Sequence, residues 1–179
     1  MTIKKTKYSI CFSSFFACCV LILAFVSCSG GNEKKGSEAV QQYDGVTLNV
    51  DISGVDCLAI LLASDGTINR KGSGNVDTLD KNFFMGLTTK GAFDSLMGSI
   101  SNDLLAYCNT SQPNCDTVKQ TYKVKIAFGN SNTSCEIEHC VNGTINDLPK
   151  PIKAFIEKAI VVTDSWYQSQ RKLLNKQAR

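Results

Sequence analysis

The chain has 179 residues, of which 43% are hydrophobic and 20% are charged. This is the composition of an ordinary globular protein and excludes a disordered chain. Three of its 19 basic residues (Lys4, Lys5 and Lys7) precede Cys28, and all 16 acidic residues follow it, so the part from Cys28 onward is neutral. Nucleic-acid binding depends on clustered Lys and Arg. We therefore expect one domain that has no nucleic-acid partner.

The N-terminal segment has the layout of a secretory signal peptide. A short polar stretch with three lysines precedes an apolar run over 10–26, which is broken at Ser13 and Ser14. Small Ser27 and then Cys28 follow, as expected of a cleavage site. The alternative is an uncleaved transmembrane helix, but a span needs about 20 apolar residues and this run is shorter. We therefore expect 1–27 to be removed.

The segment Phe25-Val26-Ser27-Cys28 resembles the lipobox of bacterial lipoproteins, although Phe25 stands where that family more often has Leu. The resemblance implies that the thiol of Cys28 carries a diacylglycerol and that fatty acyl chains such as palmitate anchor the protein to a cell membrane. Stable anchoring takes more than one acyl chain, and this modification supplies three. Ser29 resembles the outer-membrane sorting type, so we expect the outer membrane in a host that has two membranes.

Beyond the lipid anchor, two regions are predicted. Residues 28–44 are rich in Gly, Ser, Glu and Lys and lack periodic apolar residues, which is typical of a flexible tether. Residues 45–179 form a single globular domain in this interpretation. Its strands are predicted where apolar and polar residues alternate or where a short apolar run lies between turn residues: 46–52, 57–64, 67–70, 122–128 and 135–141, with 83–87 as a further short candidate.

Turns and helices complete the predicted order. Asp65-Gly66 between two strand-like runs indicates a hairpin whose two central residues take positive φ. Apolar residues recur at helical spacing over 89–107, with a weak middle that suggests two short helices, and again over 151–167. The order β-β-β-(β)-α-β-β-α predicts an α+β domain, a mostly antiparallel sheet of about five strands with two helical segments on one face. The apolar run 58–62 suggests a central strand covered on both sides, so a partner would cover the other face.

His139 is the only histidine, and Cys135, Glu136, Glu138 and Cys140 stand close to it in the sequence. This cluster invites a metal or catalytic interpretation. In an extended strand, however, Cys135 and His139 share a face about 13 Å apart while the other three point the opposite way. We therefore predict no catalytic residue, no metal and no cofactor.

The five cysteines beyond Cys28 can form disulfides in an exported protein. Cys108 and Cys115 flank a proline-containing loop, so we predict that they pair with each other. Cys135 and Cys140 are too far apart in one extended strand to bridge. At least one cysteine must stay unpaired, and we expect it to be a buried thiol that packs as a small hydrophobic residue.

Trp166 lies beside the apolar face of the last predicted helix and is our candidate ligand contact. With Tyr122, Phe128 and Tyr167 it could form an aromatic platform for a glycan. Tyr167 continues the apolar face of the helix, however, so we expect it to pack in the core. Because no acid–base or nucleophile set is apparent, we favour a non-enzymatic envelope module that binds a protein or a glycan near its membrane. The alternatives are a small envelope hydrolase or transferase with an unrecognised site, and an inhibitor-like domain.

Overall fold

A computed structural model describes residues 43–74, 82–110, 115 and 120–177. Cys28, the leader and most of the tether lie outside the described residues. The described chain is an α+β unit with one six-stranded sheet. Its strands are β1 (Gly45–Ile52), β2 (Val55–Ala63), β3 (Thr67–Lys71), β4 (Phe83–Leu87), β5 (Thr121–Gly129) and β6 (Ser134–Asn142). Its helices are α1 (Lys90–Met97), α2 (Asn102–Leu105), the short 3-10 helix η2 (Ile145–Asp147) and α3 (Lys150–Gln177).

The predicted α+β class and antiparallel sheet are confirmed, and the element order is broadly as predicted, but the sheet has six strands and not about five. The short candidate 83–87 is a full member of the sheet, and the region 89–107 forms two helices, as its weak middle suggested. Gly98 ends α1, and the side chain of Ser101 then accepts a hydrogen bond from the Leu104 amide and begins α2. A cap of this kind supplies an acceptor to an N–H group that has no partner within its own helix.

The sheet has the order β4-β3-β2-β1-β5-β6, and every neighbouring pair is antiparallel. The hairpin predicted at Asp65-Gly66 joins β2 to β3. The prediction of two positive φ angles was wrong, because the loop has three residues and only Gly66 has a positive φ, of 90°. The Gly66 amide donates to the Ala63 carbonyl over 3.0 Å, and the Asp65 carboxylate accepts from the Thr67 amide over 2.8 Å.

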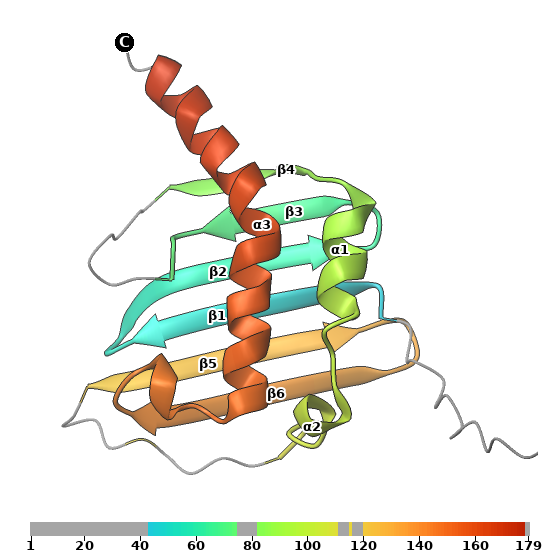
Figure 1. Cartoon of the computed structure of the whole chain (residues 1–179), viewed down its shortest axis with the longest axis vertical. Helices are drawn as coiled ribbons and strands as arrows, with labels where there is room; N and C mark the ends of the chain where they lie inside the picture. Colours follow the sequence, from blue (N-terminus) through green and yellow to red (C-terminus); the bar gives the residue numbers. More distant parts are fainter. Residues whose placement is uncertain (1–42, 75–81, 111–114, 116–119, 178–179) are drawn as a thin grey trace, which may run out of the picture. The chain divides into compact units, whose positions relative to one another are not determined.

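The core lies between the sheet and the helices, and α3 crosses the strands one after another (Figure 1). Phe155 of α3 lies 6.1 Å from Phe128 of β5, and Tyr167 lies 5.6 Å from Phe84 of β4, measured between ring centroids. The alternating residues of β1 and β5 pack against this helix and are almost fully buried. The predicted apolar stripe of the last helix is therefore the main partner of the sheet.

The cysteine pairing differs from the prediction. Cys108 bonds to Cys135 and Cys115 bonds to Cys140, so the predicted Cys108–Cys115 bridge is wrong. Cys135 and Cys140 do not bond to each other, as expected, because they lie on opposite faces of β6. The expected unpaired thiol is Cys57, which is buried.

The reason for the different pairing is the path of the chain after α2. The Asn109 amide donates to the Glu136 carbonyl over 2.8 Å, and the Glu136 amide donates to the Asn109 side-chain oxygen over 3.5 Å. Asn109 therefore lies against the outer edge of β6. Each neighbouring cysteine then reaches a cysteine of β6, and the segment does not close on itself.

Candidate functional site

The sheet has one face that no described helix covers, because α1, α2 and α3 all pack on the same side (Figure 1). We call the opposite side the open face. Its side chains form rows across paired strands, and one such row runs from β4 to β6 through Met85, Asn69, Leu61, Thr47, Ala127 and Glu136. No helix or strand in the described ranges therefore covers the second face of the sheet, and the expectation of a partner there stays a prediction.

The open face changes character from one edge to the other. At β4 it exposes Phe83, Met85 and Leu87, whose exposed fractions are 53%, 69% and 74%. At β5 and β6 it carries charged side chains, including the pair of Lys125 and Glu136 with 3.9 Å between nitrogen and oxygen. An exposed pair of this kind contributes little to stability. The apolar end is the part of the open face that points to a ligand, because exposed apolar patches mark interaction sites.

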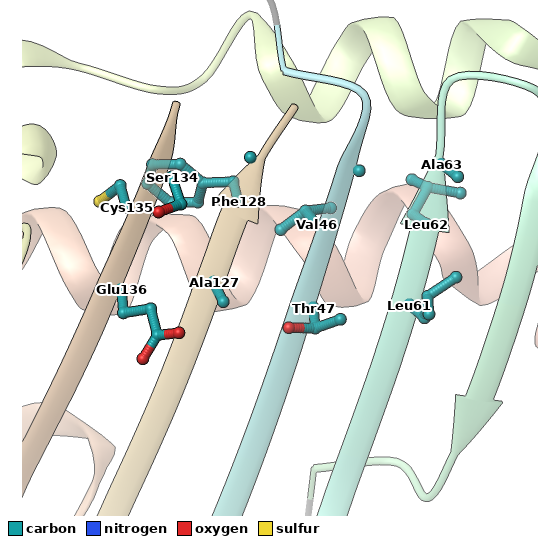
Figure 2. Close-up of a pocket in the computed structure, with 12 residues that line it drawn as sticks. Val46, Thr47, Leu61, Leu62, Ala63, Ala127, Phe128, Ser134, Cys135 and Glu136 are labelled. Carbon is teal, nitrogen blue, oxygen red and sulfur yellow. The ribbon is translucent and has the colours of Figure 1, made fainter. Parts of the chain in front are cut away.

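A shallow hollow of about 310 Å³ lies over the end of the sheet where β1 begins (Figure 2). Thr47, Leu61 and Ala127 line it from one row of the open face. The next row contributes small residues, which leave the hollow open: Gly45, Ala63, Gly129 and Ser134. This volume is at the lower end for ligand pockets, and the hollow can seat one or two apolar side chains.

The β4 strand forms one edge of the sheet. Its sequence, Phe-Phe-Met-Gly-Leu, has no charged residue and no proline. Proteins commonly protect an edge strand with charges, prolines, bulges or a covering segment, because an unprotected edge pairs with other chains. Among the described residues, β4 is the last strand on this side of the sheet, and neither a charge nor a proline within it protects its outer side.

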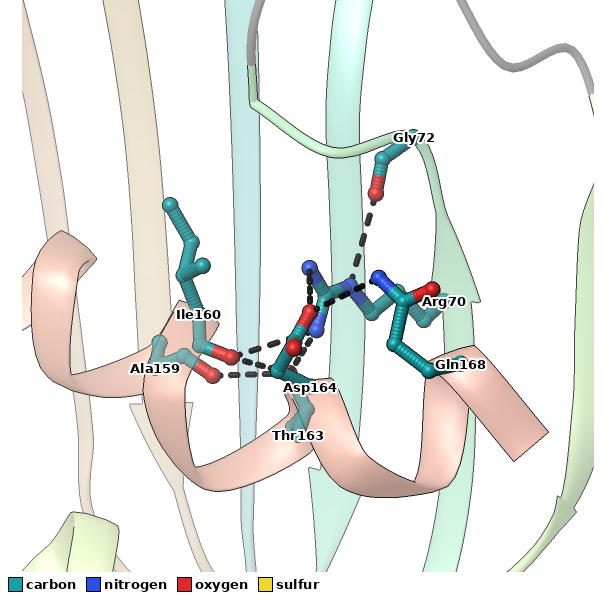
Figure 3. A network of polar contacts seen from close by, with 7 residues as sticks. All are labelled: Arg70, Gly72, Ala159, Ile160, Thr163, Asp164 and Gln168. Atoms are coloured by element: carbon teal, nitrogen blue, oxygen red, sulfur yellow. Dashed lines mark hydrogen bonds and ion pairs between the residues drawn. The ribbon is translucent and has the colours of Figure 1, made fainter. Parts of the chain in front are cut away.

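Arg70 of β3 is buried on the helix side of the sheet and fixes α3 to the sheet (Figure 3). Its guanidinium donates to the Thr163 hydroxyl over 2.8 Å and to the Ile160 carbonyl over 3.2 Å, and lies 4.4 Å from the Tyr167 ring centre. Burial lowers its pKa, whereas the charge of Asp164, 3.7 Å away, acts in the opposite direction. Because its donors are directed at groups of the same chain, Arg70 positions the helix and does not form a ligand site.

Trp166, the predicted ligand contact, lies at the β4 edge on the helix side of the sheet. Its indole is half-buried against Gly86, where a methyl group in place of the glycine hydrogen would lie 3.2 Å from the ring. Tyr122, Phe128 and Tyr167 are buried in the core. The predicted aromatic platform is therefore not formed, while Trp166 remains close to the apolar edge.

His139 lies on the helix side of β6, next to Tyr107, with 6.1 Å between the ring centres. Burial lowers its pKa, and its Nδ1 atom has no hydrogen-bond partner among the described residues. Glu136 and Glu138 point to the open face, as the alternation predicted. Within the described ranges no three side chains of His, Cys, Asp or Glu come together in a way that could hold a metal ion.

Two further findings bear on location and relatedness. None of the helices in the described part of the chain combines the length and the apolar character that a bilayer crossing requires. No protein-family model matches the chain, and no curated protein matches it.

Proposed function

We propose that this protein is a lipid-anchored envelope protein that binds another polypeptide through β4 and the adjoining apolar end of the open face. The observation that carries the proposal is the exposure of Phe83, Met85 and Leu87 on an unprotected edge strand. Aromatic residues and Met are enriched in protein interfaces. Burying each such side chain is worth roughly 1.5–3 kcal/mol, which is enough for three anchors to offset a substantial part of the cost of association.

A polypeptide is favoured over a glycan by the chemistry of this edge. An edge strand presents backbone N–H and C=O groups in a row, and these match the backbone of an added strand. A glycan platform would combine exposed aromatic rings with hydrogen-bonding side chains. At this edge only Phe83 among the described residues is a well-exposed ring, and its exposed neighbours on β4 are the apolar Met85 and Leu87. The rings of Tyr122, Phe128 and Tyr167 are buried. A non-enzymatic role is favoured because His139 lies on the helix side of the sheet, away from the exposed apolar residues.

The proposed anchor would keep this surface close to a membrane. The described chain begins at Tyr43, whose ring lies 4.9 Å from that of Phe128, so the tether joins the domain at the end of the sheet that holds the hollow. If the tether expected from the sequence behaves as a coil, it would span on the order of 20 Å. The binding partner is then another envelope polypeptide within that reach, on the membrane that carries Cys28.

The anchor is tested by replacing the lipidated thiol. We expect Cys28→Ala to abolish the incorporation of labelled fatty acid and to move the protein from the membrane fraction to the soluble fraction or leave it as an unprocessed precursor. Cys18→Ala in the leader is the matched control and should leave labelling unchanged. Unchanged labelling in the Cys28 variant would remove the lipoprotein assignment.

The binding surface is tested with a photo-crosslinking amino acid in intact cells. Met85 and Val161 are 69% and 68% exposed, but Val161 lies on the outer side of α3, away from the sheet. We expect a crosslinker at position 85 to give a discrete adduct with one polypeptide and the same crosslinker at position 161 to give none. Equal adducts from both positions, or none from position 85, would contradict the proposal.

A further inference from the structure

The length of α3 can be compared with the width of the sheet that this helix crosses. Between Phe155, which contacts β5, and Tyr167, which contacts β4, the helix rises about 18 Å. The four strand spacings from β5 to β4 amount to about 19 Å. The helix therefore runs almost perpendicular to the strands and passes one strand in about three residues. Arg70 of β3, bonded to Thr163, lies where this spacing places it.

The helix continues beyond the last strand of the sheet (Figure 1). We call residues 168–177 the overhang; its length is about 15 Å. Leu173 and Leu174 follow Trp166 and Tyr167 by seven residues, so they belong to the same, sheet-facing side of the helix. They are 53% and 39% exposed, because no described strand lies beneath them. The apolar stripe of α3 is thus longer than the sheet by about two strand positions.

We infer that β4 accepts an additional strand beneath the overhang. This inference rests on the proposed function and specifies how the partner binds. The two features complement each other: β4 is the last strand of the described sheet, and the overhang supplies an apolar cover for one side of a strand that would pair with it. Addition of a strand to an exposed edge is an established mode of peptide recognition, in which main-chain hydrogen bonds give affinity and side-chain contacts give specificity.

A second copy of this chain does not fit beneath the overhang. Antiparallel pairing of two β4 strands about Met85 would place apolar residues opposite each other. However, α3 crosses β4 between Phe84 and Gly86, which contact Tyr167 and Trp166. A two-fold axis near Met85 would direct each overhang into the α3 helix of the other copy, whereas packed helices need 8–10 Å between their axes. The added strand must therefore come without a covering helix of its own.

The residues around the site define the chemistry of the added segment. One set of its alternating side chains would contact Leu173 and Leu174, and the other would extend the apolar surface of Phe83 and Met85. The overhang carries Arg171, Lys172 and Lys176, and no acidic residue follows Asp164. The occupant is thus an extended segment with alternating apolar side chains and acidic residues at its flank. The tether of this chain does not qualify, because 29–42 has no apolar residues except Ala39 and Val40.

The probe for this site is a displayed library of random peptides about twelve residues long, selected on the chain from Ser29 onward without its lipid. Residues 41–179 form one compact unit with its own core, so this protein can be studied in solution. Trp166 is the only tryptophan and lies beside the site, so bound peptide should change its fluorescence. We expect the selected peptides to alternate apolar residues and to contain acidic ones.

Variants of α3 then test the overhang itself. The double variant Leu173→Glu/Leu174→Glu should weaken binding of the selected peptides at least tenfold, while Val161→Glu should leave it unchanged. Both changes introduce charges at exposed positions, so the fold is retained. If the double variant binds as tightly as the parent, the strand does not lie beneath the overhang, although the crosslinking test at Met85 can still support the proposed function. Failure of that crosslinking test would remove both.

Removal of the overhang gives a second, independent test. A chain that ends at Tyr167 lacks the overhang, the segment that prevents two β4 strands from pairing. We expect sedimentation velocity to show a monomer for the complete domain and a dimer for the shortened one, and Met85→Lys in the shortened chain should restore the monomer. A complete domain that is already a dimer, and that Met85→Lys converts to a monomer, would overturn the inference in favour of a second copy.

Discussion

The two edges of the sheet are built in opposite ways. At the β6 edge, Cys108–Cys135 lies on the helix side and Cys115–Cys140 on the open side, and Asn109 forms two hydrogen bonds with Glu136 between them. At the β4 edge an uncharged strand exposes three large apolar residues on the open face, and on the other face α3 extends beyond this last strand (Figure 1). The comparison shows one edge that disulfides and hydrogen bonds close, and one edge whose strand exposes apolar side chains, which is the edge where we propose that a partner binds.

The largest expected effect comes from opening the closed edge. Replacing both Cys108 and Cys135 by Ala removes a bridge with a sequence separation of 27, and we expect a loss of about 3–4 kcal/mol in the free energy of unfolding. Urea denaturation under oxidising conditions measures it. Cys57→Ala is the control, because this thiol is unpaired and its loss should cost only about 1 kcal/mol.

The same variants sharpen the comparison between the edges. Peptide binding at β4 should be unchanged in the Cys108/Cys135 variant at temperatures where it is folded, because the bridge lies at the opposite edge. Peptide mapping by mass spectrometry without reduction should recover Cys108 linked to Cys135. Recovery of Cys108 linked to Cys115 would contradict the closed β6 edge described above.

The next effect concerns the residue that holds α3 over the β4 edge. Arg70→Ala removes a buried side chain together with its bonds to Thr163 and Ile160, and we expect a loss of about 3 kcal/mol. Arg70→Met refills most of the volume without a charge and should cost about 1 kcal/mol or less. Equal losses in the two variants, measured by urea denaturation, would show that the charge and not the packing determines the effect.

Much of this fold follows from local patterns. Alternation over 46–52, 122–128 and 135–141 predicted strands that the structure confirms, because one face of each is buried and the period of a strand is two. It also predicted that Glu136 and His139 would point to opposite faces. The number of strands was underestimated because the exposed side chains of 83–87 are apolar, so apolar and polar residues do not alternate along this strand.

The features of the candidate site depend on long-range contacts and were missed. The disulfide pairing is decided by the path of the chain beside β6, which no spacing within 108–115 reveals. The exposed edge of β4 depends on strand order. One signal was available: Leu173 and Leu174 continue the helical period of Trp166 and Tyr167, and a stripe that runs past the last strand could have indicated an overhang.

A smaller effect is expected from Asn109, which covers the β6 edge with a φ of 56°. Non-glycine residues rarely adopt this conformation, and Asn tolerates it better than most. Asn109→Ala should therefore cost about 1–2 kcal/mol through strain and the lost bond to the Glu136 amide. Asn109→Gly relieves the strain and should cost less. Faster hydrogen exchange of the Glu136 amide in both variants would confirm that this side chain covers the edge.

The smallest effect is a pH dependence that arises at the closed edge. Burial lowers the pKa of His139 from its ordinary value of 6.5, so the unfolded chain takes up a proton before the folded chain does. The contribution of the neutral His139 ring to the free energy of unfolding is complete above about pH 6.5, and it decreases as the pH falls toward the pKa of His139 in the folded chain. His139→Phe keeps the ring contact with Tyr107 and should reduce the loss of stability between about pH 7.5 and about pH 5.5. Glu138→Gln, on the open face, is the control and should retain it. If both variants lose stability to the same extent as the parent, the dependence arises elsewhere and the β6 edge contributes no titrating group.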